Sequence, residues 1–263
     1  MPINNSTKEI LDFYYNKYNN PDFIIDDPIS IPHRFSKKQD IEIAGFLTSV
    51  IAWGRRSMII KNANRIIELM DDSPYDFIMN HMEHERLKFT DFKHRTFQPV
   101  DALYFIEFLQ YYYKDHDSLE EAFTVGQNPE NINIRTSLEN FHDYFFDNEN
   151  SLQRTKKHIP TPKRKSTCKR INMFLRWMVR NDDKGVDFGI WNKIKPADLM
   201  IPIDVHVERI GKMLGLLERK QRDWQAVEEL TDNLRLYDPE DPVKYDFALF
   251  GYGVMESKEN QHP

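Results

Sequence analysis

An aspartate at the start of a predicted helix is the first candidate for chemistry. The segment IPIDVHVERIGKMLGL, residues 201–216, places Asp204 after an apolar, proline-containing approach and before apolar residues at helical spacing. Aspartate is a good helix N-cap, because its carboxylate accepts hydrogen bonds from backbone N–H groups that the first helical turn leaves unpaired. Taken alone, Asp204 favours this capping role over a catalytic one, so its surroundings have to decide between them.

A cationic stretch precedes this aspartate. From Ser151 to Arg180 the chain contains ten Lys or Arg residues and no acidic residue, although its formal net charge is -6. A solvated basic loop and a phosphate-binding surface explain such a run equally well. The run ends in CKRINMFLRWMVR, where apolar residues occupy one helical face. A second face, predicted to be exposed, carries Lys169, Asn172, Arg176 and Arg180. An ordinary amphipathic surface helix is the simpler interpretation, and a DNA phosphate held at its N-terminus is the functional one.

The composition limits the class of protein. The chain has 263 residues, enough for a large core in one domain or two lobes. Its single cysteine, Cys168, excludes an internal disulfide and a multi-cysteine zinc or iron–sulfur site, and no metal or cofactor is expected. No apolar run is long enough to cross a bilayer, and the N-terminus lacks the pattern of a signal peptide. We therefore expect a soluble cytoplasmic protein.

The elements that must position these residues are predicted to be helices throughout. No alternating strand pattern persists, so the predicted fold class is all-α. The first two helices form a helix-turn-helix pair, in which Gly54 ends the first helix and Ser57 caps the second. Residues 126–134 and 151–168 are predicted to be irregular connections. Helices are predicted over residues 41–53, 58–70, 100–115, 137–146, 169–180 and 205–217.

Taken together, the segments around Asp204 and Lys169 resemble a known family. IPIDVHVERIGKMLGL is similar to the catalytic segment of the helix-hairpin-helix DNA glycosylases, and its Asp-Val-His form is nearest to their 8-oxoguanine branch. The resemblance implies that Asp204 is the catalytic carboxylate as well as the cap of its helix. CKRINMFL resembles the second helix of the hairpin, which places Lys169 on the Schiff-base nucleophile of bifunctional members and Asn172 on a recurring polar position.

The resemblance covers most of residues 41–70 and 163–254 and is nearest to an uncharacterised bacterial branch. The first range resembles the helix-turn-helix that family members press into the DNA minor groove. The segment DWQAVEELTDNLRLYDPEDPVKYDFALFGYGV resembles the two helices that follow the Asp204 segment in the same lobe. The implied architecture is a two-lobed, all-α helix-hairpin-helix glycosylase fold. Residues 41–195 would form one lobe, and residues 1–40 with 196–263 the other.

The resemblance implies base-excision repair, with a damaged base in double-stranded DNA as substrate and an oxidised purine as the first expectation. The base would be flipped into a pocket, Asp204 would stabilise the positive charge left on the sugar, and Lys169 could attack the anomeric carbon. That attack needs a neutral amine, which desolvation and the nearby Arg170 and Lys165 would favour. The chain is expected to be a monomer and not to bind a membrane. The expected DNA contacts are Trp53, Arg55 and Arg56 as a wedge, Lys163, Arg164, Lys165 and Arg170 on phosphates, and Asn172, His206 and Arg209.

Three departures from the family pattern leave alternatives open. Lys165 and Thr167 occupy hairpin positions that usually carry glycine, the interval from Lys169 to Asp204 is long, and the iron–sulfur cysteines are absent. Lys169 is therefore either a nucleophile or a phosphate contact, and the chain is either an enzyme or a noncatalytic helical DNA-binding protein. A purely structural interaction module would leave the basic run unexplained. The enzyme hypothesis requires the Lys169 amine and the Asp204 carboxylate to face one cleft.

Overall fold

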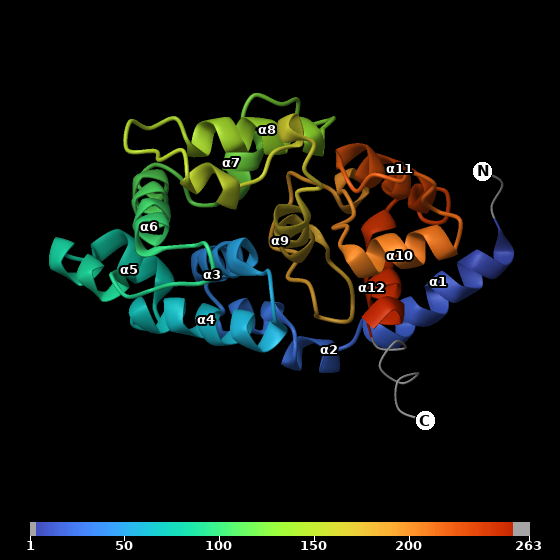
Figure 1. The fold of residues 1–263 in the computed structure, drawn as a ribbon, viewed down its shortest axis with the longest axis horizontal. Coiled ribbons are helices and arrows are strands. Elements are labelled where there is room, and N and C mark those ends of the chain that lie inside the picture. Colours follow the sequence, from blue (N-terminus) through green and yellow to red (C-terminus); the bar gives the residue numbers. More distant parts are fainter. Residues whose placement is uncertain (1–3, 255–263) are drawn as a thin grey trace.

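The computed structural model describes residues 4–254, and within this range the protein consists of helices, turns and loops (Figure 1). The prediction of an all-α fold is confirmed, since two isolated bridges, His94 with Phe97 and Asn128 with Asn131, are the extended pairings in the described range. No helix in residues 4–254 has both the length and the apolar character to cross a membrane. The α-helices are α1 (Asn5–Tyr18), α2 (Asp22–Ile25), α3 (Lys38–Ile51), α4 (Arg56–Leu69), α5 (Pro74–Asn80), α6 (Pro99–Tyr113), α7 (Glu120–Thr124), α8 (Ile134–Phe145), α9 (Lys169–Val179), α10 (Val205–Met213), α11 (Trp224–Arg235) and α12 (Asp246–Val254).

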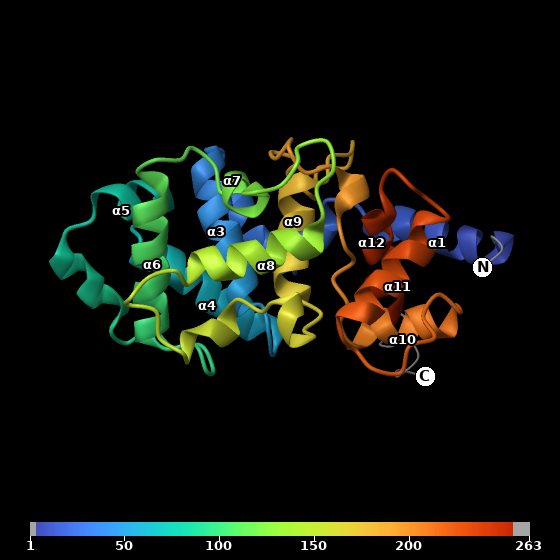
Figure 2. The same cartoon turned by 90° about the horizontal axis from the view of Figure 1, so that it is seen from above.

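Helix α9 lies at the centre of the molecule, between the group α3 to α8 and the group formed by α1 and α10 to α12 (Figures 1 and 2). It packs on α3, where the rings of Phe46 and Phe174 are 5.6 Å apart. Every residue from Ile171 to Arg180 is buried. The prediction that α9 has an exposed basic face is therefore wrong. Arg176 and Arg180 are 4% and 0% exposed, and both are paired with buried carboxylates.

The two ends of the described chain pack against each other. Helix α1 lies along α12 (Figure 1), where the rings of Tyr14 and Tyr252 stack with centroids 4.4 Å apart. Helix α12 also contacts α10, so α1, α10 and α12 form one packed group. Part of the N-terminal segment contacts the other group of helices. The short 3-10 turns η1 (Pro28–Ser30) and η2 (Pro32–Arg34) pack on α3.

The expected helix-turn-helix pair is present as α3 and α4, with a turn that differs from the prediction. Helix α3 ends at Ile51, and the N-cap of α4 is Arg55, whose backbone is extended. Ser57 lies inside the first turn of α4 and is not its cap. Gly54 has a φ of 110°, a conformation that glycine adopts at low cost. The turn is thus made by backbone geometry at Gly54 without a side-chain cap, and it carries Arg55 at an exposed position.

Candidate active site

A pocket of about 640 Å³ lies where the two helix groups meet. Its wall is formed by the segment before η1, the turn after α3, and residues of α4, α9, α12 and the start of α10. Lys169 and Asp204, which the sequence analysis paired, both line it. The volume lies in the range of pockets that enclose a small organic ligand. The arrangement required by the enzyme hypothesis, with both side chains on one cleft, is therefore present.

Asp204 is the N-cap of α10, as its sequence position predicted. Its Oδ1 accepts hydrogen bonds from the backbone N–H groups of His206 and Val207 at 2.9 and 3.0 Å. Within residues 4–254, Oδ2 accepts no hydrogen bond, and the side chain is partly exposed to the pocket. One oxygen thus fixes the carboxylate at a helix start while the other remains available to a ligand. Capping and chemistry are compatible roles for this residue.

Lys169 is the first residue of α9, and its amine reaches the pocket beside Met173. The Lys169 Nζ lies 3.6 Å from Met173 Sδ, and no described carboxylate lies within 4.0 Å of it. Its expected cationic neighbours point elsewhere. Arg170 donates to the backbone carbonyl oxygens of Val50 and Lys157, while Lys165 is exposed on the hairpin. Burial lowers the pKa of Arg170 to about 10. Arg170 thus ties α9 to α3 and the basic loop, and its guanidinium is already occupied.

The connection before α9 keeps left-handed backbone without glycine. Lys165 and Cys168 have φ values of 58° and 50°. Lys165 stands where the family pattern usually has glycine, so the unusual conformation is present at a cost of about 1 kcal/mol. The first arm is a 3-10 turn, η5 (Pro162–Arg164), and not an α-helix. In residues 4–254, the backbone N–H groups of Ser166 and Thr167 have no acceptor. The connection before α9 therefore offers two backbone donors of the kind that bind an anion.

Cys168 has no role as a nucleophile in this arrangement. Its side chain is fully buried at the start of α9, and burial raises the pKa of its thiol to about 12. The thiolate is the reactive form, so a buried thiol with a raised pKa is inert.

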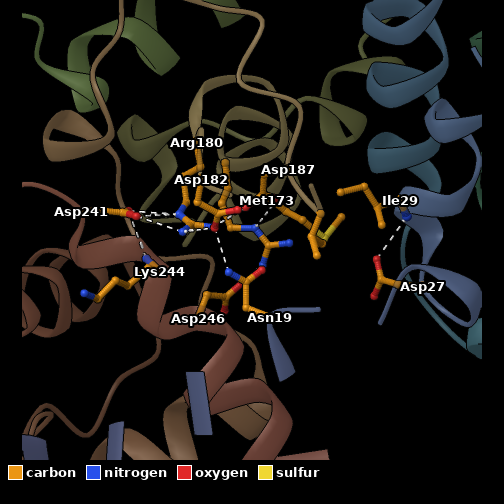
Figure 3. Close-up of polar contacts among 12 residues, drawn as sticks. Asn19, Asp27, Ile29, Met173, Arg180, Asp182, Asp187, Asp241, Lys244 and Asp246 are labelled. Atoms are coloured by element: carbon orange, nitrogen blue, oxygen red, sulfur yellow. Dashed lines mark hydrogen bonds and ion pairs between the residues drawn. The ribbon is translucent and has the colours of Figure 1, made fainter. Parts of the chain in front are cut away.

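Behind the pocket, two arginines of α9 lie among four carboxylates (Figure 3). Arg180 Nη1 lies 2.5 Å from an oxygen of Asp187, which is in the connection after α9. Arg180 Nε lies 3.0 Å from both oxygens of Asp241. Burial would lower the pKa of Arg180, but its carboxylate partners raise it well above the usual value. Arg176 joins the same group to α12 through Asp246. The four carboxylates are Asp182, Asp187, Asp241 and Asp246.

The buried carboxylate of Asp246 makes folding stability depend on pH. Burial raises the pKa of Asp246 to about 6, with the Arg176 guanidinium acting against the rise and the Asp204 carboxylate adding to it. Between pH 3.8, the ordinary pKa of this side chain in an unfolded chain, and about pH 6, the folded protein binds more protons than the unfolded chain. The contribution of Asp246 to the free energy of unfolding is therefore expected to fall with rising pH in this window, by up to about 3 kcal/mol.

Urea unfolding of the wild type and an Asp246→Asn variant at pH 4 and pH 7 checks this expectation. Asparagine does not titrate, so the stability of the wild type relative to the variant should decrease from pH 4 to pH 7. Equal pH dependence of the two proteins would contradict the raised pKa of Asp246.

Several predicted DNA contacts lie at the mouth of the pocket. Trp53 lines the pocket, and the Arg95 guanidinium covers its ring at 4.7 Å from the centroid. The neighbouring Arg55 is exposed, whereas Arg56 is partly buried in the pocket wall and lies 5.5 Å from the ring centroid of Phe250. His206 also lines the pocket. Of the three residues predicted to form the wedge, Arg55 is exposed, whereas Trp53 and Arg56 are part of the pocket wall.

The remaining predicted contacts fall into two groups. Lys163 and Arg164 are exposed on η5, although the Lys163 amine is 2.5 Å from an Asp143 oxygen. Arg209 is exposed on α10 and donates to the Gly253 carbonyl oxygen at 2.8 Å. Asn172 is 1% exposed and donates to the Thr167 carbonyl oxygen at 3.1 Å, so it braces the hairpin from inside. In this structure Asn172 therefore supports the connection before α9 and presents little surface to a ligand.

Sequence reasoning missed several residues of the pocket wall, among them Asp27, Met173 and Phe250. Met173 could have been found, because it lies one helical turn after Lys169. Asp27 had only the signal of an aspartate before proline, which predicts a cap, and it does cap η1. In residues 4–254, no group of three or more His, Cys, Asp or Glu side chains is arranged to hold a metal ion.

Comparison with protein families found one matching model, described as a protein of unknown function (DUF2400), over residues 27–255. Searches of curated proteins and of solved structures found no match. The matched range includes every residue that lines the pocket.

Proposed function

Because the chain belongs to the DUF2400 family, whose description assigns no function, we propose one from the site itself. The protein is a DNA glycosylase that takes a damaged base into the pocket and cleaves its N-glycosidic bond, and Lys169 gives it AP lyase activity. The observation that carries this proposal is the presence of Lys169 and Asp204 on the wall of one pocket, with Asp204 Oδ2 accepting no hydrogen bond within residues 4–254.

The chemistry follows from the two side chains. As the bond between the base and the anomeric carbon lengthens, positive charge grows on the sugar, and the fixed Asp204 carboxylate stabilises it. The Lys169 amine, having given up a proton, then forms a bond to the anomeric carbon as the base leaves with the bonding electron pair. The adduct becomes a Schiff base when the sugar ring opens, and strand cleavage follows.

The surroundings of the pocket fit a nucleic-acid substrate. The exposed Arg55 lies on the turn beside the pocket, and the hairpin adds Lys163, Arg164 and the unpaired N–H groups of Ser166 and Thr167. Cations and backbone donors of this kind hold phosphates and leave base recognition to the pocket. An oxidised purine in a DNA duplex remains the first expectation for the substrate.

Borohydride trapping tests the proposal. Purified protein is incubated with labelled duplexes that contain 8-oxoguanine, an alkylated purine, uracil or an abasic site, in the presence and absence of borohydride. We expect a covalent adduct with the wild type, none with Lys169→Gln, and an undiminished adduct with the control variant Lys88→Gln, whose lysine is exposed, is paired with Asp71 and does not line the pocket. An adduct that survives in Lys169→Gln would exclude Lys169 as the nucleophile.

The noncatalytic alternative has its own support in the altered hairpin, where Lys165 replaces glycine and an α-helical first arm is missing. It predicts binding of the same duplexes without base release or trapping. Base release without trapping would retain the glycosylase and remove the lyase activity.

A further inference from the structure

Asp27 is a buried carboxylate that the chemistry of Lys169 and Asp204 does not use. It is 8% exposed and lines the same pocket. Its Oδ1 accepts a hydrogen bond from the Ile29 N–H at 3.1 Å (Figure 3). No residue in the described range donates a hydrogen bond to Oδ2. Carboxylates are rarely buried without partners, because desolvation of the charge is costly. Asp27 is more than nine-tenths buried, and its Oδ2 therefore remains an available hydrogen-bond acceptor on the pocket wall.

A hydrogen-bond donor lines the same pocket. Burial raises the pKa of Asp27, and the nearby cations Arg176, Arg56 and Lys169 act against the rise. Arg176 is committed to its own carboxylates. The Arg56 guanidinium lines the pocket and donates no hydrogen bond within residues 4–254, its one described contact being the face of Phe250. The wall thus carries a carboxylate acceptor and a guanidinium donor, both available to a ligand.

We propose that Asp27 and Arg56 read the lactam edge of the base, the –NH–CO– unit in which a ring N–H adjoins a carbonyl group. The N–H donates to Asp27 Oδ2, and the carbonyl oxygen accepts from Arg56. This inference rests on the glycosylase function proposed above and names the chemical class of its base: one that carries a lactam, as 8-oxoguanine, hypoxanthine and uracil do. An amino base such as adenine presents the opposite order, an acceptor nitrogen beside an amino donor.

Selection by such a pair has a physical basis. A site with buried polar groups rejects a ligand that leaves them unpaired far more strongly than an apolar site rejects a change in shape. The order of donor and acceptor on the pocket wall therefore selects the class of base.

The test is a binding comparison that needs no chemistry. Two duplexes carry either hypoxanthine or adenine on a 2′-fluoro sugar that resists cleavage, each opposite a tetrahydrofuran abasic analogue so that neither base is paired. The two bases differ only at the edge in question. The wild type is expected to bind the hypoxanthine duplex about tenfold more tightly or better.

Asp27→Asn is the decisive variant. The Asn carbonyl oxygen can keep the hydrogen bond from the Ile29 N–H, which turns the amide NH2 toward the pocket and replaces an acceptor with a donor. The preference for hypoxanthine should fall to about one or reverse. Arg56→Met should also reduce it, and provides a second measurement if Asp27→Asn does not fold. Asp26→Asn, the same change at the exposed neighbouring residue, should leave the preference unchanged.

Borohydride trapping on an abasic site completes the test, because no base is present there to be read. Asp27→Asn should form as much adduct with this duplex as the wild type does. Loss of that adduct would mean that Asp27 acts on Lys169 and would overturn base reading. A preference for hypoxanthine that survives in Asp27→Asn, or its absence in the wild type, would overturn base reading and leave the glycosylase proposal standing. A wild type that binds none of the duplexes would overturn both.

Discussion

Replacing Asp204 with asparagine is expected to lower the rate of base release by about a thousandfold and to leave the fold intact. Asparagine is as good an N-cap as aspartate, so the hydrogen bonds from His206 and Val207 can be kept. The negative charge facing the sugar is lost, and removal of one preorganised electrostatic group typically costs about 10²- to 10³-fold in rate. Single-turnover release of base from the duplex that the wild type processes measures the effect.

Asp223→Asn is the matched control for this change. Asp223 is the N-cap of α11, where its carboxylate accepts from the Ala226 N–H at 3.2 Å, and it does not line the pocket that holds Lys169. The same substitution there should leave the rate of base release unchanged. If Asp204→Asn lowers the rate less than tenfold, Asp204 serves only as a cap.

The second large effect is expected from Arg180→Met, which should destabilise the protein by about 3–5 kcal/mol. Arg180 is 0% exposed, and the substitution leaves the buried Asp187 carboxylate and its neighbour Asp241 without their shared cation. Methionine has a similar length, so the loss comes mainly from uncompensated charge and less from a cavity. The free energy of unfolding in urea measures it.

An exposed ion pair provides the comparison for Arg180→Met. The side chains of Lys163 and Asp143 are 51% and 59% exposed, and Lys163→Met should change stability by less than about 1 kcal/mol. A similarly small effect of Arg180→Met would show that water reaches the carboxylates when the arginine is removed. That result would argue against a closed, buried ion network around α9.

The parts of the fold that were predicted correctly depend on local sequence. Apolar spacing located α3, α4, α6 and α8, because each of these helices buries one or more faces at the helical period. The N-cap role of Asp204 depends only on local hydrogen bonds, from the backbone N–H groups of His206 and Val207. The meeting of Lys169 with Asp204 on one pocket was expected from the family resemblance, since periodicity alone does not place two helices relative to each other.

The errors concern contacts between distant segments. The spacing of Asn172, Arg176 and Arg180 shows correctly that they share a face of α9, but spacing does not reveal what covers that face. The cover includes Asp246, which is 70 residues after Arg176 and whose carboxylate makes burial of the guanidinium possible. Asp27 was missed for the same reason, since its position before a proline indicates a cap and says nothing of the pocket opposite.

The contact between α1 and α12 makes the pocket depend on segments that are translated at different times. Helix α1 is made before α3 to α8, whereas its partner α12 is made after them. Phe250, a wall of the pocket, lies in this later helix. The intervening helices can fold while part of the apolar surface of α1 is still uncovered. A chain that stops before α12 therefore lacks a complete pocket.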